Sequence, residues 1–308
     1  MSKALLDGRA QFEATVEGLT ARPRHLPTAW LYDEHGSRLY EAVTRLPEYY
    51  LPRREAEILQ ARSPAIAPRT LIELGSGAAT NTRRLLDALP SLEELVLFDV
   101  SASILTASAA TIARAYPALS VRALVGDFER DLGVLPRGER RLIAFLSSTI
   151  GNLTPEQRSR FLTALSASLG NSDAFLVGLD LVKDVHRLGA AYNDEGGTTE
   201  AFVRNALTAV NAVLGGTFDQ ARFSYEARWD ARHEWMEIGL RAREAHVVYI
   251  RGLGLEVAFN ADELLRVEIS AKFRRQVFEG ELDRAGLGLE SWWTDAAGDY
   301  AVALAFRN

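Results

Sequence analysis

Residues 70–77 read TLIELGSG, a short and nearly continuous apolar run that ends in two glycines separated by a serine. Apolar runs of this length, ended by glycine, are typical of strands buried on both faces of a parallel sheet. Glycines at such a point allow a tight turn and a close approach of the backbone to a ligand. The stretch therefore predicts a buried first strand and a turn leading into a helix.

Four more segments follow the same pattern along the chain. Strands are predicted over 95–100, 121–125, 142–147 and 174–179, and helix or loop separates each from the next. Strands that alternate with helices imply βαβ units with right-handed crossovers. We therefore expect an α/β fold built on a Rossmann-like parallel sheet.

The end of the chain predicts an antiparallel hairpin at the edge of that sheet. Two strand candidates, 289–294 and 300–306, flank the turn-forming residues 295–299. We expect residues 61–190 and 285–308 to form one domain around the sheet.

The remaining residues, 1–60 and 191–284, are expected to form a second, smaller α+β lobe. The first sixty residues predict mostly helix, including one over 53–62 after a proline. The region 189–243 again favours helix, before strands near 237–242 and 246–250.

Composition excludes several classes of function. The 308 residues include 35 Lys and Arg against 41 Asp and Glu, a net charge of −6, so no basic face is available to bind nucleic acid. Cysteine is absent, which excludes disulfides, thiolate nucleophiles and thiolate metal sites. The five histidines lack the spacing of metal ligands, and we expect no metal.

No stretch approaches the roughly 20 apolar residues that cross a bilayer. The first twenty residues also lack the apolar centre of a secretory signal. We therefore expect a cytoplasmic monomer whose partner is a small molecule, with neither membrane nor nucleic acid.

Polar groups stand at the ends of three successive predicted strands. Gly75 and Gly77 follow the first, Asp99 ends the second, and Asp127 and Phe128 follow the third. A carboxylate can accept hydrogen bonds from ribose hydroxyls, and an aromatic ring can face an adenine. Taken singly, the acids could be a helix N-terminal carboxylate and a loop acid. Three at the carboxyl ends of parallel strands favour a nucleotide-like ligand.

The glycine turn fits neither of two common nucleotide motifs. Thr80 occupies the third small position of a dinucleotide fingerprint, and no Gly-Lys-Ser/Thr sequence follows to make a phosphate-binding loop. The acid before the glycines, the acid of the second strand and the Asp-Phe pair together resemble S-adenosylmethionine-dependent methyltransferases. That resemblance implies S-adenosylmethionine as the cofactor.

Further motifs resemble a narrower family, the histidine-specific Nα-methyltransferases of ergothioneine biosynthesis. These motifs are WLYD at 30–33, LPEYY at 46–50, STIGNLT at 148–154, DLVKD at 180–184, EISAKF at 268–273, WWTD at 292–295 and Gly298-Asp299. The likeness runs from about residue 26 to 307. It implies transfer of three methyl groups to the α-amine of L-histidine, giving the betaine hercynine.

The resemblance also implies roles for single residues, all of them positional rather than catalytic. For the substrate it implies Tyr49 at the imidazole through water, Asn152 and Tyr192 at the carboxylate, Tyr32 near the amine, and Glu268 and Ser270 at the imidazole nitrogens. For the cofactor it implies Gly75, Asp99, Asp127 and Phe128, together with Asn81, which stands where the family often has lysine.

Elementary chemistry agrees with the imidazole assignment. Glu268 and Ser270 are two apart, so on a strand they point to one face and can address both ring nitrogens. Without the resemblance they could equally be solvent-facing residues of a half-exposed strand, and Tyr192 could be a helix packing residue. Asn152 falls just beyond the fourth strand, before a helix that Thr154, Pro155 and Gln157 predict by a capping box.

Three departures from the family pattern are present, and the change at Ile238 leaves the substrate open. Ile238 stands where the family has a pocket methionine, Gly239 replaces a bulky residue, and Ser147 replaces a glycine. A methyltransferase of the same fold that acts on tryptophan or a histidine analogue is therefore an alternative. A nicotinamide dehydrogenase and a non-catalytic binding protein are alternatives of other classes.

Overall fold

The computed structural model describes residues 3–62, 67–77, 79–89 and 91–308, apart from the side chains of residues 3–9 and 80. Ala78 and the side chain of Thr80 therefore lie outside the described residues. Thr80 is the residue that counts against a dinucleotide fingerprint in the sequence. The chain divides into two compact units. Unit 1 comprises residues 1–49 and 184–270, and unit 2 comprises residues 50–183 and 271–308.

Unit 2 is built on a seven-stranded sheet in the order β11-β12-β5-β4-β1-β2-β3. The strands are β1 (Thr70–Leu74), β2 (Glu94–Asp99), β3 (Ser120–Val125), β4 (Arg141–Phe145), β5 (Ala174–Asp180), β11 (Leu287–Thr294) and β12 (Tyr300–Arg307). The first five pair in parallel, and β12 pairs antiparallel with both β5 and β11. The predicted Rossmann-like sheet and its antiparallel terminal hairpin are both confirmed.

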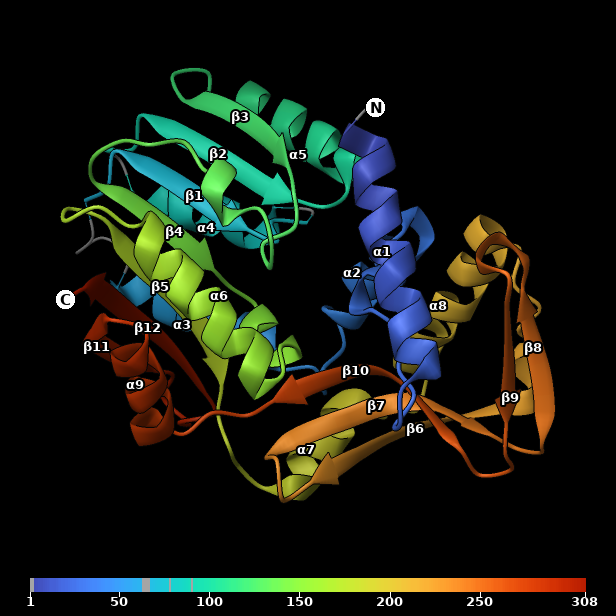
Figure 1. Cartoon of the computed structure of the whole chain (residues 1–308). Coiled ribbons are helices and arrows are strands. Elements are labelled where there is room, and N and C mark those ends of the chain that lie inside the picture. Colours follow the sequence, from blue (N-terminus) through green and yellow to red (C-terminus); the bar gives the residue numbers. More distant parts are fainter. Residues whose placement is uncertain (1–2, 63–66, 78, 90) are drawn as a thin grey trace. The chain divides into compact units, whose positions relative to one another are not determined.

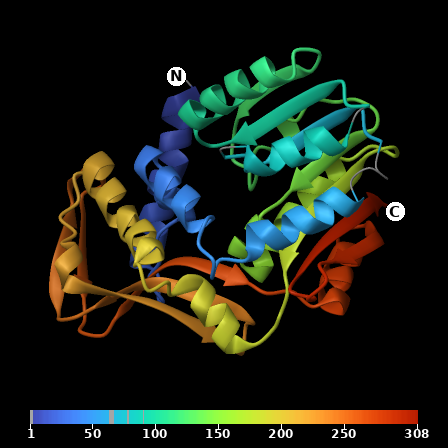
Figure 2. The ribbon, with the colours of Figure 1, turned by 180° about the vertical axis from the view of Figure 1, so that it is seen from behind.

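Helices cover both faces of this sheet. Figure 2 shows α3 (Leu51–Arg62), α4 (Thr80–Ala88) and α5 (Ala102–Ala115) on one face, and Figure 1 shows α6 (Pro155–Ser168) and α9 (Arg275–Arg284) on the other. Short 3₁₀ turns, η3 (Leu132–Val134) and η4 (Thr149–Asn152), follow β3 and β4. The predicted capping box is present at the start of α6. Because β1, β2, β4 and β5 are almost wholly buried, their residues form the core of unit 2.

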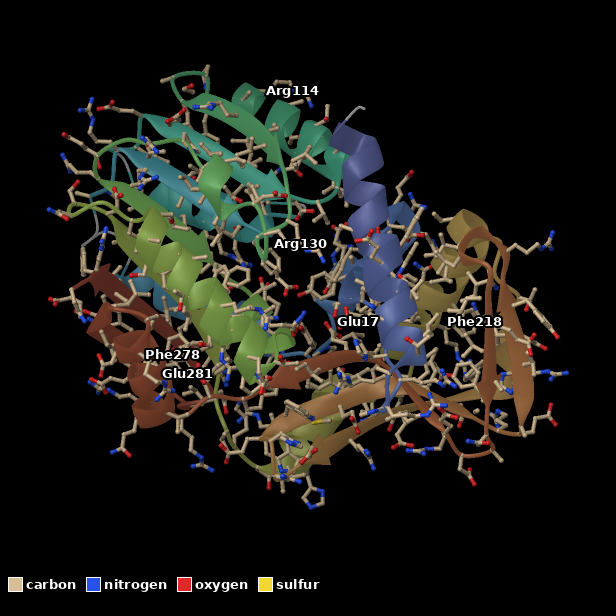
Figure 3. The ribbon with its side chains drawn as sticks, viewed as in Figure 1. Glu17, Arg114, Arg130, Phe218, Phe278 and Glu281 are labelled. Atoms are coloured by element: carbon tan, nitrogen blue, oxygen red, sulfur yellow. The ribbon has the colours of Figure 1, made fainter. Side chains whose placement is uncertain are left out.

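Helix α9 is fixed to unit 2 by an apolar contact and an ion pair (Figure 3). The Phe278 ring packs against Phe273 and Trp292, with centroid separations of 5.4 and 6.5 Å. Glu281, one turn further on, accepts from the Arg158 guanidinium of α6 at 2.6 Å. Both contacts hold residues 271–284 against the sheet.

Unit 1 combines helices with two small sheets. Its helices are α1 (Lys3–Thr20), α2 (Glu34–Val43), α7 (Val185–Tyr192) and α8 (Thr198–Leu214), with 3₁₀ turns η1 (Thr28–Leu31), η5 (Gln220–Arg222) and η6 (Arg251–Leu253). Its strands are β6 (Phe223–Asp230), β7 (Trp235–Ala242), β8 (His246–Ile250), β9 (Leu255–Phe259) and β10 (Leu264–Ala271), whose last residue belongs to unit 2. The sheets have the orders β10-β7-β6 and β8-β9.

One prediction from the sequence was wrong, and the expected domain boundaries differ from the two units. Residues 223–230 form β6 rather than helix, because their polar side chains pair across the sheet: Arg241 with Glu226 at 2.7 Å and Arg228 with Glu237 at 2.6 Å. The predicted domain boundaries, 61–190 with 285–308 and 1–60 with 191–284, also differ from the observed units. Helix α3 packs on α4 and β12, and α9 packs on β11, so both belong to unit 2.

A buried network lies where the chain enters and leaves unit 2. The Asp180 carboxylate, at the end of β5, accepts from the Tyr50 hydroxyl at 2.9 Å, from the Lys272 ammonium at 2.8 Å and from Lys183. Burial favours the protonated acid, but the two lysines outweigh it and hold the pKa of Asp180 below its usual value. The carboxylate is therefore a charged group that depends on both cations.

Asp180→Asn should lower the free energy of unfolding by about 3 kcal/mol, because it leaves two buried ammonium groups without their anion. Urea unfolding at pH 7 measures this loss. As a control, Asp283→Asn on the exposed side of α9 should change stability by about 0.5 kcal/mol or less. Equal stability of the two variants would contradict the importance of the network.

Candidate active site

The glycine turn after β1 has a backbone that requires its glycines. Gly75 has φ +63° and Gly77 has φ +48°, in the left-handed region that residues with a β-carbon rarely adopt. The Gly75 amide donates to the Phe98 carbonyl of β2 at 2.8 Å. The turn is thereby held against the end of the neighbouring strand.

Asp99 links the ends of β1 and β2. Its carboxylate accepts from the Gly77 amide at 3.0 Å and from the Ser101 amide at 2.9 Å. The bond to Ser101 is the helix-start role that the sequence left open, and the bond to Gly77 fixes the glycine turn. Burial raises the pKa of Asp99, and the backbone bonds oppose that rise. Each carboxylate oxygen can accept a further donor, so a ribose hydroxyl can still bind there.

Phe128 lies beside the same turn. Its ring is 4.9 Å from that of Phe145 in β4, and a β-carbon added to Gly75 would lie 3.9 Å from it. Asp127, the preceding residue, donates its backbone N–H to Asp131 at 2.9 Å and accepts from the Glu129 amide at 2.8 Å. The three strand ends singled out in the sequence therefore meet around Gly75–Gly77.

Asn81 is engaged with protein groups. Its amide donates to Glu55 at 2.6 Å and to the Ser147 hydroxyl at 3.0 Å, and its carbonyl oxygen accepts from Arg84. Its predicted contact with the cofactor stays a prediction.

Glu73, the acid before the glycines, is a buried carboxyl group on β1. It accepts from the Thr82 hydroxyl of α4. Burial raises its pKa to about 8, Thr82 opposes the rise, and the nearby Glu55 and Asp99 add to it. At neutral pH Glu73 is therefore mostly protonated.

The predicted substrate residues of unit 1 form a continuous row of rings and hydroxyls. Tyr49 packs edge-on against Tyr192 at a centroid distance of 6.0 Å, and the Tyr192 hydroxyl lies 2.8 Å from the Ser270 hydroxyl on β10. Tyr32 joins this row through Tyr40, whose ring is 5.6 Å from Tyr32 and 6.4 Å from Tyr49.

Glu268 contributes negative charge to the same region. It lies half-buried on β10, two residues before Ser270, and the predicted strand is confirmed. Burial raises the pKa of both Tyr49 and Tyr225, and the charge of Glu268 raises each further. Glu268 therefore lies within electrostatic reach of two tyrosines, in a position to bind a ring N–H or a cation.

The sequence analysis missed two tyrosines of this region. Tyr40 bridges the rings of Tyr32 and Tyr49, and nothing in its local sequence marks it. Tyr225 donates its hydroxyl to the Tyr192 carbonyl at 2.5 Å. It was missed because its strand, β6, was predicted as helix.

The two pocket departures have different structural settings. Ile238 is fully buried on β7 opposite Ala227, on the face of the β6–β7 pair that also carries Tyr225. A β-carbon at Gly239 would lie 2.5 Å from the Leu265 carbonyl, so the neighbouring strand excludes any side chain there.

The candidate residues divide between the two units. Tyr32, Tyr49, Tyr192, Glu268 and Ser270 belong to unit 1, whereas Asn152 and the five cofactor candidates belong to unit 2. Asn152 ends η4, directly after a turn in which Ser147 and Ser148 have φ +60° and +54°. The Ser148 hydroxyl accepts from the Asp180 amide at 3.0 Å, which connects this turn to the buried network.

Two kinds of feature are absent from the described residues. Among them, no group of three or more His, Cys, Asp or Glu is arranged to hold a metal ion. Nor does any described helix combine the length and apolarity needed to span a membrane.

Comparison with known proteins identifies the family. A family model described as histidine-specific, S-adenosylmethionine-dependent methyltransferase matches residues 12–307. The chain belongs to this family. This match confirms the resemblance found in the sequence. It also confirms the prediction that the protein is a methyltransferase that uses S-adenosylmethionine.

The chain is similar to several known proteins at different levels of sequence identity. The chain is 49% identical to the histidine N-alpha-methyltransferase of Mycobacterium tuberculosis, over 94% of this chain and 92% of that protein. It is 24% identical to an L-tryptophan methyltransferase of Psilocybe serbica, over 94% and 90%. A solved S-adenosylmethionine-dependent methyltransferase from Clostridium acetobutylicum shares the fold, with a TM-score of 0.51 at 10% identity, over 88% of this chain and 98% of that one.

Glu73→Gln should make the protein less sensitive to alkaline pH. The folded state keeps the Glu73 proton up to about pH 8, whereas the unfolded chain loses it near the ordinary pKa of 4.5. Wild-type stability therefore falls between these values as pH rises, and glutamine removes that loss, which is about 5 kcal/mol at most. Urea unfolding from pH 5 to 9 should show the variant gaining on wild type until about pH 8.

A matched control is Glu290→Gln, an exposed residue of β11 in the same unit. Its stability difference from wild type should stay constant over this pH range. A constant difference for Glu73→Gln as well would show that Glu73 does not titrate as described.

Tyr225→Phe should raise the KM for the amino-acid substrate about threefold to tenfold, because Tyr192 loses the hydroxyl that holds its carbonyl. Affinity for S-adenosylmethionine should not change. Steady-state kinetics and calorimetry measure the two, with Tyr249→Phe on the exposed face of β8 as control. If KM is the same in both variants, Tyr225 does not position Tyr192.

Proposed function

We propose that this protein transfers three methyl groups from S-adenosylmethionine to the α-amine of L-histidine, forming hercynine, a reaction of ergothioneine biosynthesis. The observation that carries the proposal is the polar set on β10. Ser270 is bonded to Tyr192, and Glu268 lies two residues before it on the same strand. Its relative named histidine N-alpha-methyltransferase supports the same substrate.

The groups around the glycine turn fit S-adenosylmethionine. The Ser76 hydroxyl is buried and has no hydrogen-bond partner among the residues that the structure describes. Asp99 keeps acceptor capacity for ribose hydroxyls, and Phe128 offers an aromatic face. The cofactor supplies an electrophilic methyl group and a neutral thioether leaving group. We assign Gly75, Asp99, Asp127 and Phe128 to its binding, with Asn81 at the edge of the set.

In unit 1, Glu268 and Ser270 would bind the two imidazole nitrogens, with Tyr49 beside the ring. A substrate without those nitrogens would leave both polar side chains unpaired, which gives strong discrimination against apolar amino acids. On the family resemblance we assign Tyr192 and Asn152 to the substrate carboxylate, and Tyr32 to the amine.

The side chains assigned to the amine are neutral, and this suits the reaction. The amine must lose a proton before it can attack, and its ordinary pKa of about 8 requires only a modest downward shift near neutral pH. A carboxylate beside it would favour the unreactive ammonium form. Tyrosine rings can also stabilise the quaternary ammonium product, by about 0.5–2 kcal/mol.

We further propose that unit 2 binds the cofactor and unit 1 the amino acid, and that the protein acts as a cytoplasmic monomer. A second candidate function is methylation of tryptophan or a histidine analogue. Buried Ile238 favours it, because a β-branched side chain in place of a flexible thioether changes the shape of the pocket.

Mass spectrometry of histidine incubated with the protein and S-adenosylmethionine should reveal three added methyl groups. Mono- and dimethylhistidine should also be consumed, and tryptophan should react much more slowly. Faster turnover of tryptophan than of histidine would favour the second candidate.

Glu268→Ala should raise the KM for histidine by about a hundredfold, since a charged hydrogen bond to the imidazole is lost. S-adenosylmethionine affinity should stay near the wild-type value. Steady-state kinetics and calorimetry measure the two, with Glu256→Ala on exposed β9 as the control. Unchanged histidine kinetics would remove Glu268 as the imidazole-binding group.

A further inference from the structure

Glu55 is a buried carboxyl group to which the sequence analysis gave no role. It lies on α3, is fully buried, and accepts hydrogen bonds from three other segments of unit 2. The donors are the Asn81 amide at 2.6 Å, the Ser147 backbone N–H at 2.8 Å and the Tyr300 hydroxyl at 2.7 Å. One side chain therefore joins α3 to α4, to the turn after β4 and to the start of β12.

Two of these segments border the candidate site. Asn81 is the second residue of α4, the helix that begins after the glycine turn. Ser147 is the first of the two left-handed residues that lead to η4 and Asn152. A residue with a β-carbon is strained in that conformation, so the turn needs an outside partner to hold it.

The space around Glu55 leaves the carboxyl group little freedom. A β-carbon at Gly178 of β5 would lie 2.1 Å from the Glu55 carboxylate and 2.4 Å from the Tyr300 hydroxyl. Strand β5 therefore requires a glycine, which has no side chain, at position 178. Such close packing means that a change at Glu55 is transmitted to its partners.

We propose that Glu55 is a positioning residue for methyl transfer: by accepting from Asn81 and Ser147 together, it fixes the start of α4 and the Ser147–Ser148 turn against each other, beside the glycine turn that binds the cofactor. It does not need to touch the cofactor. Its ionised form can accept from all three donors, whereas the protonated form has an O–H of its own that opposes one of them.

Glu55 changes between its protonated and ionised forms near neutral pH. Burial raises the pKa of Glu55 to about 7, and the bonds from Tyr300 and Ser147 and the charge of Arg84 on α4 oppose the rise. Glu73 on β1 interacts with it as a second buried carboxyl group. The carboxylate is therefore lost as pH falls through about 7, and cofactor affinity should fall with it.

Glu55→Gln tests the hydrogen bond without changing the size of the side chain. Glutamine has one acceptor oxygen, and its NH₂ group would face the NH₂ group of Asn81. Calorimetry without histidine should show S-adenosylmethionine binding about tenfold more weakly at pH 8. The variant's affinity should also be nearly independent of pH between 6 and 8, while that of wild type rises.

The double variant Glu55→Gln, Asn81→Asp restores the pairing in reverse. The amide of the introduced glutamine can donate to the carboxylate of the introduced aspartate, which can still accept from Arg84. Because Asn81 is itself assigned to the cofactor, Asn81→Asp alone is measured as well. At pH 8 the double variant should bind at least about threefold more tightly than the sum of the two single losses would give. Glu57→Gln, an exposed residue of the same helix, is the control and should bind as wild type does.

Hydrogen exchange of the apo protein gives a readout that does not depend on the cofactor. In Glu55→Gln the Ser147 amide keeps an oxygen as its acceptor, but that oxygen no longer carries a negative charge, so the amide should exchange faster than in wild type. After correction for the intrinsic rate, exchange of this amide in wild type should slow as pH rises from 6 to 8, whereas in the variant it should not change. The proposal would be overturned if Glu55→Gln bound S-adenosylmethionine as tightly as wild type and its Ser147 amide exchanged at the wild-type rate. So would a double variant whose loss of affinity equals the sum of the losses in the two single variants.

This inference rests on the proposed function only in that both require S-adenosylmethionine. The binding and exchange measurements contain no histidine. If histidine is not methylated but Glu55→Gln weakens cofactor binding as described, only the proposed substrate fails. If histidine is trimethylated and Glu55→Gln binds the cofactor normally, only the role of Glu55 fails.

Discussion

The Asp180 carboxylate contacts all three points at which the chain passes between the two units. Tyr50, Lys183 and Lys272 each stand within two residues of such a point, and each is bonded to Asp180. Burying an unpaired charge destabilises the folded state, so the carboxylate and the two ammonium groups can be buried only as partners of one another. The network therefore fixes where unit 2 begins and ends along the chain. Through the bond from its amide to Ser148, Asp180 also supports the turn that carries Asn152.

The two units differ in the chemistry of their candidate residues. Unit 2 gathers buried acids, Glu55, Glu73 and Asp99, around a glycine turn, and burial raises the pKa of each. Unit 1 instead offers tyrosine rings and hydroxyls with the single acid Glu268 among its predicted residues. An ionised carboxyl group suits a cationic cofactor, and neutral rings suit an amine that must become uncharged before it reacts.

Most of the unit 2 sheet could be predicted from the sequence, because its signals are local. Each signal lies within a few neighbouring residues, as in the apolar run 70–74, the glycines after it and the capping box at Thr154. Strand β6 could not be predicted, because its polar residues are stabilised as a strand by pairing with residues of β7. The unit boundaries failed for the same reason, since α3 belongs to unit 2 only through packing on α4 and β12.

The candidate site was predictable where a motif marks it and not elsewhere. Glu268 and Ser270 follow from strand periodicity together with the family resemblance. Glu55 has no such signal: its three partners are 26, 92 and 245 residues away in the sequence. Tyr225 likewise acts through Tyr192, 33 residues earlier. Residues that support others through long-range hydrogen bonds leave no pattern for a single sequence to show.

The position of β12 has a consequence for how the protein is made. This strand, residues 300–307, inserts between β5 and β11 and covers the apolar edge of β5. During translation β5 emerges more than a hundred residues before its partner, so the nascent chain carries an uncovered sheet edge until synthesis reaches β12. Folding of unit 2 is thus tied to a strand that leaves the ribosome long after β5, and in the interval between them the chain most needs protection from aggregation.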